Sequence, residues 1–279
     1  MKTITLTDHA RRIARAMALL ADRIDDPPSL DALADAAAFS PYHFHRAYRM
    51  LAGETPAETL ARLRLSRAAA ALLKTDAPMA QVARGAGYGS VAAFTRAFRD
   101  AHGIPPGAYR AQGGIGSEDH MHQIRHTEFP AMTLAVLDHR GSYDHIGPVY
   151  DRLSAWAAAR GLIGEATRFI ALYWDDPSSV PDAELRSAAG LTVPPGTPVS
   201  DGVRLIEVPA MRCAALRFQG PYAELEGAYD WLYGTWLPAS GEEPADHPMM
   251  EEYLNDPRSL PPSEWLTDVM MPLKARVPA

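Results

Sequence analysis

The stretch FHRAYR at Phe44–Arg49 decides how the first part of this chain folds. It recurs fifty residues later as FTRAFR at Phe94–Arg99. In each copy the two aromatic residues stand four positions apart, which places them on one face of a helix, while the arginines point elsewhere. The pattern predicts two helices of the same design. Each packs on a core through its aromatic stripe and leaves its other face available to an anion.

The residues around each copy predict a short helix, a tight turn and a second helix. Ser40-Pro41 opens the helix of the first copy and Ser90 caps that of the second, and a glycine and then a proline follow both copies at the same offset. Upstream, residues 7–24 are expected to form a helix capped by Thr7. This order of elements is typical of the helix-turn-helix.

A long connecting helix is predicted between the two copies. Thr55 and Glu58 form a capping box with Pro56 at the first helical position, and the helix should run to about Lys74. Such a helix spans about 28 Å. Successive major grooves on one side of DNA lie about 34 Å apart. The connector could therefore hold two recognition helices at a spacing that suits a duplex.

These segments resemble the DNA-binding domain of the AraC/XylS family over residues 7–111. The resemblance rests on 39–46, on 87–98 and on the closing Gly103–Pro106. It implies that the exposed side of both helices contacts DNA, through Ser40, Tyr42, His45, Arg46, Arg49, Ser90, Val91, Ala92, Thr95, Arg96 and Arg99. Arginine suits guanine, whereas Val91 and Ala92 can make only apolar contacts, so the second helix is expected to serve mainly as a phosphate anchor. The alternative is that these arginines form salt bridges within the domain.

The second half of the chain is itself a duplication. Met132–Leu137 recurs as Met211–Leu216, and the run YWDDP at 173–177 recurs as YLNDP at 253–257. Each unit reads strand, helix, strand, strand. The sequence therefore predicts a multidomain protein, in which an all-α double helix-turn-helix domain precedes an α+β domain made of two strand-helix-strand-strand repeats. Two such repeats would pair about a pseudo-two-fold axis and leave a groove for a ligand.

Glu251 breaks this repeat, because its counterpart is Ala171. Residues two apart on a strand share a face. A lone carboxylate among aromatic residues is costly when buried, and it suits a ligand that brings a cation or hydrogen-bond donors. The neighbouring Glu252 is the alternative inward carboxylate.

This half resembles the GyrI-like small-molecule-binding domain over about 121–275. The matching runs are GPY at 220–222, WLPASG at 236–241 and EEYLNDP at 251–257. The resemblance implies an aromatic pocket for a cationic or amphipathic compound, and the predicted ligand-binding residues are Glu251, Tyr253, Tyr222, Phe169, Tyr173, Met249, Trp231 and Trp265. For the two tryptophans and for Tyr222 and Tyr253, a place in the core is the alternative.

Composition supports two domains with different partners. Residues 1–112 carry 15 Lys and Arg against 10 Asp and Glu, whereas 113–279 carry 12 against 24. A basic half suits a polyanion. We expect a DNA-binding domain at 1–112, a linker at 113–120 and the ligand-binding domain at 121–279. His120, His122 and His126 are interpreted as linker residues, so neither a metal site nor a cofactor is expected.

The single cysteine, Cys213, excludes an intrachain disulfide and favours a cytoplasmic setting. The start of the chain lacks a signal-peptide core, and no apolar run reaches the length of about 18 residues that a membrane span needs.

Together these features favour a sequence-specific transcription regulator that binds promoter DNA, a small organic effector and RNA polymerase, and that is not an enzyme. The alternatives are a GyrI-like hydrolase of reactive small molecules and a protein-binding module that modulates gyrase.

Overall fold

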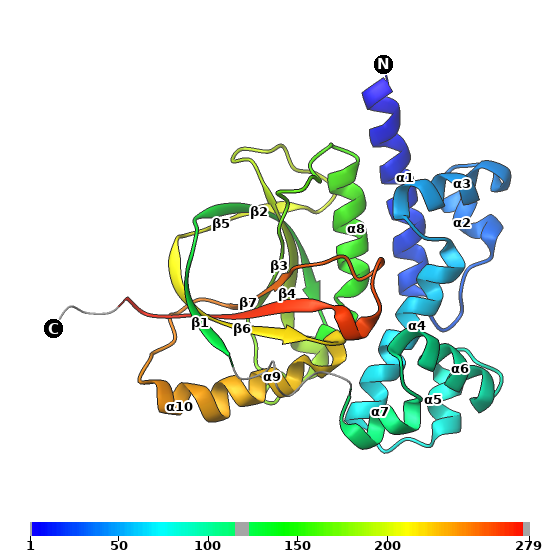
Figure 1. Cartoon of the computed structure of the whole chain (residues 1–279). Helices are drawn as coiled ribbons and strands as arrows, with labels where there is room; N and C mark the ends of the chain where they lie inside the picture. The colour runs from blue at the N-terminus through cyan, green and yellow to red at the C-terminus, as the bar shows by residue number, and fades with distance from the viewer. Residues whose placement is uncertain (1, 115–122, 276–279) are drawn as a thin grey trace. The chain divides into compact units, whose positions relative to one another are not determined.

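The structure is a computed structural model that describes residues 2–114 and 123–275. The chain forms two compact units (Figure 1). The first holds the residues up to Ala108 together with Asp144–Thr167, and the second holds Tyr109–Tyr143 together with the residues from Arg168 onward. The segment Asp144–Thr167 thus joins the helical unit, although it lies inside the sequence of the predicted second domain.

The first unit consists of helices whose ends follow the predicted capping residues. Thr55 and Glu58 form the complete capping box of α4, and Ser90 accepts a hydrogen bond from the backbone of Ala93 at the start of α6. Gly53 and Gly103 end α3 and α6 in the left-handed conformation, with φ of 79° and 80°, which glycine adopts without strain. The helices are α1 (Lys2–Asp22), α2 (Leu30–Ala36), α3 (Pro41–Ala52), α4 (Pro56–Lys74), α5 (Met79–Gly85), α6 (Val91–His102) and α8 (Gly147–Ala158), and α7 (Pro106–Gln112) follows α6.

The predicted start of the first helix is wrong. Helix α1 begins at Lys2, so Thr7 lies inside it and is not its N-cap, and the helix ends at Asp22 rather than near Ile24. Thr7 is a good capping residue, and the apolar period of this helix begins after it. The apolar period marks the part of the helix that packs on the core, and α1 begins before that part.

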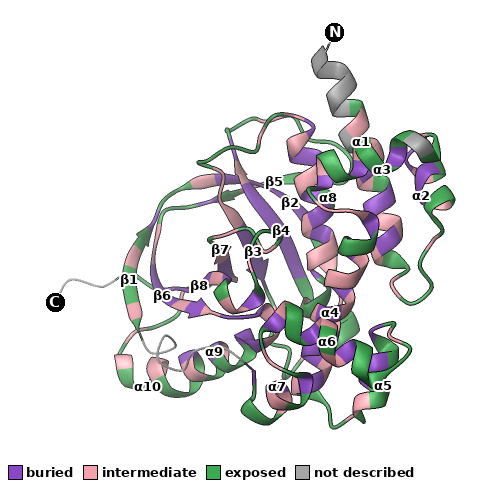
Figure 2. Ribbon diagram, turned by 45° about the vertical axis from the view of Figure 1, so that its right-hand side comes forward, coloured by how far each residue is buried: buried purple, intermediate pink, exposed green. Residues whose placement is uncertain are grey.

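The aromatic stripes pack as predicted. Phe44 and Tyr48 of α3 and Phe94 and Phe98 of α6 are fully buried. Figure 2 shows buried and exposed stretches side by side along the helices of this unit. The α3 pair packs in a cluster with apolar residues of α1 and α2, including Ile13. The fold of each recognition helix is therefore fixed by its aromatic side, and this leaves its arginine side free of any packing role.

A buried ionic network joins α8 to α3 within the first unit. Arg62 of α4 binds Glu54 at 2.6 Å and Asp151 of α8 at 3.2 Å. The Thr59 hydroxyl donates to Glu54 at 2.9 Å and lies 2.9 Å from the Tyr48 hydroxyl. Burial works to lower the pKa of Arg62, but the two carboxylates raise it above its ordinary value. The guanidinium therefore stays charged and holds both carboxylates.

The second unit is an antiparallel eight-stranded sheet in the order β1-β6-β8-β7-β3-β4-β2-β5. Its strands are β1 (Ile124–Phe129), β2 (Met132–Arg140), β3 (Phe169–Tyr173), β4 (Arg186–Val193), β5 (Arg204–Val208), β6 (Met211–Gln219), β7 (Met249–Tyr253) and β8 (Leu266–Pro272). The helix α9 (Leu225–Trp231) continues through a π-helical turn (Leu232–Trp236) into α10 (Leu237–Ser240). The predicted combination of an all-α helix-turn-helix region and an α+β region is confirmed.

Each repeat has one strand more than the sequence indicated. Strands β1 and β5 precede the predicted ones, and they are exchanged between repeats, since β1 pairs with β6 and β5 pairs with β2. Both are edge strands with several exposed side chains, so they lack the apolar run that marked the inner strands. His126 lies in β1, so its interpretation as a linker residue was wrong, whereas His120 and His122 lie outside the described residues.

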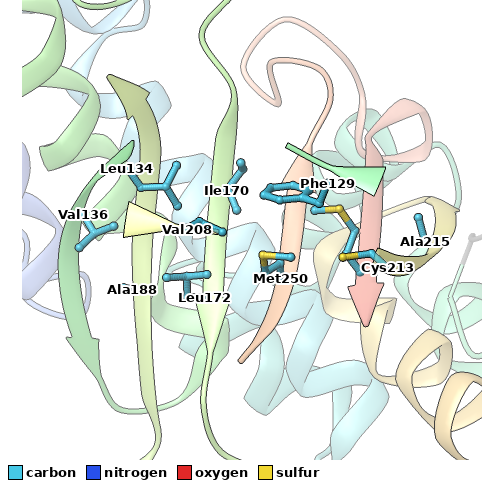
Figure 3. Packing of buried hydrophobic residues seen from close by; sticks show 11 residues of the cluster. Phe129, Leu134, Val136, Ile170, Leu172, Ala188, Val208, Cys213, Ala215 and Met250 are labelled. Atoms are coloured by element: carbon cyan, nitrogen blue, oxygen red, sulfur yellow. The ribbon is translucent and has the colours of Figure 1, made fainter. Parts of the chain in front are cut away.

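The two faces of the sheet carry separate apolar clusters. One face gathers residues such as Ile170, Cys213 and Met250 (Figure 3). The other face packs beneath α9, where Leu216, Val269 and Met271 meet Leu225 and other residues of that helix. A residue on one of the central strands therefore faces one of two distinct environments, depending on its register.

Candidate DNA interface and effector site

The arginines of both recognition helices are exposed. Arg46 and Arg49 of α3, and Arg96 and Arg99 of α6, lie on the side opposite the buried aromatic pairs. Among the described residues, Arg46, Arg96 and Arg99 form no ion pair. The carboxyl of Glu58 lies near Arg49. Its capping bonds with Thr55 lower its pKa first, and the charges of Arg49 and His45 lower it further.

Several other arginines of the first unit serve its structure. In α4, Arg64 donates to the carbonyl of Ile24 at 2.8 Å, and Arg67 pairs with Asp25 at 2.6 Å. In α1, Arg12 donates to the carbonyl of Ala37 at 2.7 Å. The described arginines of this half therefore include two kinds. Arg12, Arg64 and Arg67 bind the protein itself, whereas Arg46, Arg96 and Arg99 form no ion pair among the described residues.

The remaining predicted DNA contacts lie where the sequence placed them on these helices. His45, Ser40, Val91 and Ala92 are exposed, and Thr95 is half-buried. Ser40 occupies the N-cap position of α3 without a side-chain capping bond, which leaves its hydroxyl for another partner. The side chain of Tyr42 lies outside the described residues. The role of all these residues in DNA contact stays a prediction.

Repeat-equivalent residues meet at the centre of the sheet. Strands β3 and β7 are neighbours, and Ala171 is paired directly with Glu251, the residue that takes its place in the second repeat. The pseudo-two-fold axis therefore passes between these two residues. In the same register Phe169 pairs with Tyr253, and Tyr173 pairs with Met249. The structure thus brings four of the predicted ligand residues onto one face around Glu251.

Glu251 is a buried carboxylate surrounded by tyrosine hydroxyls. It is 4% exposed. Tyr229 donates to its Oε1 at 2.8 Å, Tyr253 donates to its Oε2 at 2.9 Å, and the Tyr173 hydroxyl lies 3.0 Å from that of Tyr253. Burial raises the pKa of Glu251, and the hydrogen bonds from the tyrosines oppose that rise. Among the described residues no Lys, Arg or His pairs with it.

Glu252, the alternative carboxylate, faces the other side of the sheet. It pairs with Arg168 through two hydrogen bonds of 2.6 and 2.7 Å. The charge of Arg168 therefore balances the charge of the Glu252 carboxylate. Of the two adjacent glutamates, only Glu251 is both buried and without a cation among the described residues.

Some of the aromatic residues predicted to bind the ligand contact one another through their rings, and others pack in the apolar core. Tyr222 lies with its ring 5.0 Å from that of Tyr253 and 4.6 Å from that of Trp265. The indole nitrogen of Trp265 donates to the carbonyl of Leu260 at 3.0 Å, which fixes this side chain. Trp231 packs in the cluster beneath α9 that also includes Tyr222.

Tyr229 is the member of this group that the sequence did not identify. It comes from α9 rather than from a strand, and burial together with the charge of Glu251 raises the pKa of its hydroxyl well above 10.0. The signal was present, because Tyr229-Asp230 repeats Tyr150-Asp151. Periodicity within a strand could not show that a helix brings a hydroxyl to the same carboxylate.

Comparison with known proteins identifies both parts of the chain. A model described as the GyrI-like small molecule binding domain matches residues 122–274, and one described as a helix-turn-helix domain matches 33–112. A DNA gyrase inhibitor of Edwardsiella ictaluri (strain 93-146) is 35% identical over 162 residues, which cover 54% of this chain and 98% of that protein. An uncharacterized HTH-type transcriptional regulator, YbfP of Bacillus subtilis (strain 168), is 31% identical over 102 residues, covering 37% of this chain and 35% of YbfP.

The fold is shared with a solved protein–DNA complex. The EcmrR–DNA complex in EcmrR-RPo superposes with a TM-score of 0.50 at 16% identity, covering 86% of this chain and 84% of that one. The chain is therefore a helix-turn-helix DNA-binding regulator with an effector domain, as its resemblances predicted. It belongs to the GyrI-like small-molecule-binding domain family, whose model matches more than half of it. Within 2–114 and 123–275, no helix has the length and apolarity that crossing a bilayer requires.

The buried carboxyl predicts a pH dependence of stability. Since burial raises the pKa of Glu251 above its ordinary 4.5, the native state holds this proton more tightly than the unfolded state does. As the pH rises from 4.5 through the native pKa, ionisation of the buried group should lower the stability of the wild type relative to Glu251→Gln. Denaturant unfolding of both proteins across this range measures the difference. The exposed Glu207→Gln serves as a control, and parallel curves for wild type and Glu251→Gln would contradict the raised pKa.

Proposed function

We propose that this protein is a one-component transcription regulator of the bacterial cytoplasm whose effector is a cationic or amphipathic organic molecule. The helical domain would hold promoter DNA through α3 and α6, and the site around Glu251 would receive the effector. The observation that carries the proposal is the burial of the Glu251 carboxylate without a cationic partner among the described residues.

The chemistry of this site supports a cation as the guest. A buried charge is costly unless it is paired, and tyrosine hydroxyls offset only part of that cost. A ligand cation would supply the missing opposite charge. The electron-rich faces of Tyr253, Tyr173 and Tyr222 also attract cations, by about 0.5–2 kcal/mol for each good contact. Apolar neighbours such as Met249 would favour the hydrophobic part of an amphipathic compound.

For the DNA interface, we propose that Arg46 and Arg96 reach base edges and that Ser90 and Arg99 bind phosphates. A guanidinium can donate two parallel hydrogen bonds to guanine. The exposed Val91 and Ala92 offer only apolar contacts, which makes α6 the less discriminating helix. RNA polymerase is the proposed protein partner, since a regulator bound at a promoter acts on transcription through it.

Loss of a recognition arginine should weaken operator binding. We expect Arg46→Ala and Arg96→Ala each to cost about 1–3 kcal/mol of affinity for the operator and to relax the preference at one base pair. Binding of a footprinted promoter fragment at fixed salt measures this. Arg204 of β5 forms an exposed ion pair with Asp138 of β2. Arg204→Ala removes an equal charge away from the recognition helices, so it should leave the affinity for the operator unchanged. Wild-type affinity in both recognition-helix variants would remove these helices from the DNA interface.

Replacing the buried carboxylate should abolish recognition of the effector's charge. Glu251→Gln keeps the size and an acceptor for Tyr229, but it removes the negative charge. We expect its affinity for tetraphenylphosphonium, an apolar cation, to fall by at least roughly tenfold, since an unscreened charge pair is worth more than 1.4 kcal/mol in a buried site. Isothermal titration calorimetry measures this, with Glu207→Gln as control. Equal affinity in Glu251→Gln would exclude Glu251 from the site.

A second candidate function is hydrolysis of a reactive small molecule. The feature that favours it is the raised pKa of Glu251, because a general base works best with a pKa near the working pH. Turnover of an electrophilic ester that disappears in Glu251→Gln would support it over simple binding.

A third candidate is modulation of gyrase. It is favoured by the 35% identity to the DNA gyrase inhibitor of Edwardsiella ictaluri over 162 residues. Inhibition of gyrase supercoiling by this protein, unaffected by Arg46→Ala, would favour a protein-binding role.

A further inference from the structure

Two buried hydroxyls on the Glu251 face have no hydrogen-bond partner among the described residues. Thr267 of β8 is 0% exposed and Ser187 of β4 is 1% exposed, and neither hydroxyl is bonded. An unpartnered buried hydroxyl has lost its water without compensation, so it carries a desolvation cost. Buried hydroxyls without a hydrogen-bond partner are uncommon in folded proteins.

Strand register places both hydroxyls at the ends of the predicted effector site. Thr267 pairs with Tyr253 across β8 and β7, and Ser187 pairs with Tyr173 across β4 and β3. Directly paired residues of an antiparallel sheet project to the same face. Both hydroxyls therefore stand on the face that carries Glu251, each beside one of its tyrosines.

The two positions are repeat equivalents, but their surroundings differ in charge. On the neighbouring strand the diagonal position from Thr267 is Glu251, whereas the corresponding position from Ser187 is Ala171. Diagonal neighbours lie about 7–8 Å apart. Beside Thr267 the site also holds the ring cluster of Tyr222, Tyr253 and Trp265. The Thr267 end therefore combines a carboxylate, aromatic rings and a free hydroxyl.

We propose that Thr267 is a hydrogen-bonding subsite of the effector site, and that the effector is a cation with a hydroxyl, carbonyl or ether group roughly 8 Å from its charged centre. This inference rests on the proposed effector role of Glu251. A bound ligand would place its cation at Glu251 and its polar group at Thr267, and it would satisfy two groups that the free protein leaves uncompensated. Ser187, which lacks the neighbouring carboxylate, is the matched position that should not take part.

A pair of matched ligands tests the subsite. Hexyltriphenylphosphonium and 6-hydroxyhexyltriphenylphosphonium differ only in a terminal hydroxyl. In the wild type we expect the hydroxylated cation to bind roughly threefold to tenfold more tightly, the worth of one hydrogen bond. In Thr267→Val, which keeps the shape of the side chain, this preference should vanish. In Ser187→Ala it should persist. Calorimetry gives the affinity ratio of the two ligands for each of the three proteins.

Measurements of thermal stability distinguish a ligand-binding role of the Thr267 hydroxyl from a structural role. If the hydroxyl has no partner in the free protein, Thr267→Val should unfold at the same or a higher temperature than the wild type, although it binds the hydroxylated ligand less well. A preference that persists in Thr267→Val overturns the subsite. A Glu251→Gln variant that binds both cations as the wild type does would overturn the proposed function instead, so the two failures are distinct.

A second inference concerns how the effector site acts on DNA, and the ionic network of the first unit carries it. Helix α8 lies in sequence between β2 and β3, and β3 supplies Phe169 and Tyr173 to the effector face. Yet α8 packs on α1, and its Asp151 binds Arg62 in the network that ends at Tyr48 of α3. Helix α8 is therefore connected covalently to the strand β3 of the effector face. It is also connected to the recognition helix α3, through the ion pairs of Arg62 and the Thr59 hydroxyl.

The segment that leads into α8 begins at the effector tyrosines. Tyr143 packs edge-on against Tyr173, with ring centroids 4.7 Å apart, and its hydroxyl donates to the carbonyl of Asp175 at 2.9 Å. The next residue, Asp144, pairs with Lys74 at the end of α4 at 2.9 Å. We infer that α8 is the element through which occupancy of the effector site changes DNA binding, again on the basis of the proposed function.

Asp151→Asn tests this route while leaving the rest of the network in place. The pair of Arg62 with Glu54 remains, so α3 and α4 keep their contact. We expect the ratio of operator affinities with and without saturating tetraphenylphosphonium to fall at least roughly threefold toward unity, with little change in affinity for the cation alone. Asp230→Asn, the exposed repeat counterpart on α9, is the control. An unchanged ratio in Asp151→Asn would overturn the route, whereas a wild-type ratio of one would overturn effector regulation itself.

Discussion

The second domain is organised around a carboxylate that has been taken out of water without a counter-ion among the described residues. Glu251 stands at the pseudo-two-fold axis of the sheet, and hydroxyls from β7 and α9 donate to it. Hydrogen bonds to a charged acceptor are stronger than neutral ones, but they do not neutralise the charge. The site therefore holds a buried carboxyl group without a cationic partner among the described residues, and the proposal of a cationic effector rests on this feature.

The duplication explains why this carboxylate stands where it does. In a two-fold arrangement the residues nearest the axis face their own counterparts, so a pair of glutamates there would repel each other. With alanine at 171 that repulsion is absent, and a single carboxyl stands at the axis. The exchange of β1 and β5 between repeats ties the two halves into one sheet, so the axis cannot open without breaking strand pairs.

Sequence patterns identified whatever depends on local periodicity, and they missed what depends on packing between distant segments. The aromatic stripes of α3 and α6, and the residues sharing a face with Glu251, follow from periods of 3.6 and 2. Tyr229 could not be found in this way, because its hydroxyl reaches Glu251 only after α9 packs on the sheet. Strands β1 and β5 were missed because edge strands with polar exposed sides carry little of the apolar signal. The place of α8 in the helical unit depends on Asp151 and Arg62, 89 positions apart.

The two recognition helices differ in their exposed side chains, and among the described contacts the network of Arg62 reaches α3. Helix α3 presents His45 and Arg46, whereas α6 presents Val91 and Ala92 near its start. The chain of contacts from Asp151 ends at Tyr48, on the buried side of α3. Under the proposed roles of the two helices, a shift of α8 would bear on α3, whose Arg46 is proposed to reach a base edge. Such an arrangement would alter which bases are read more than whether DNA is held, because base contacts require closer alignment than phosphate contacts do.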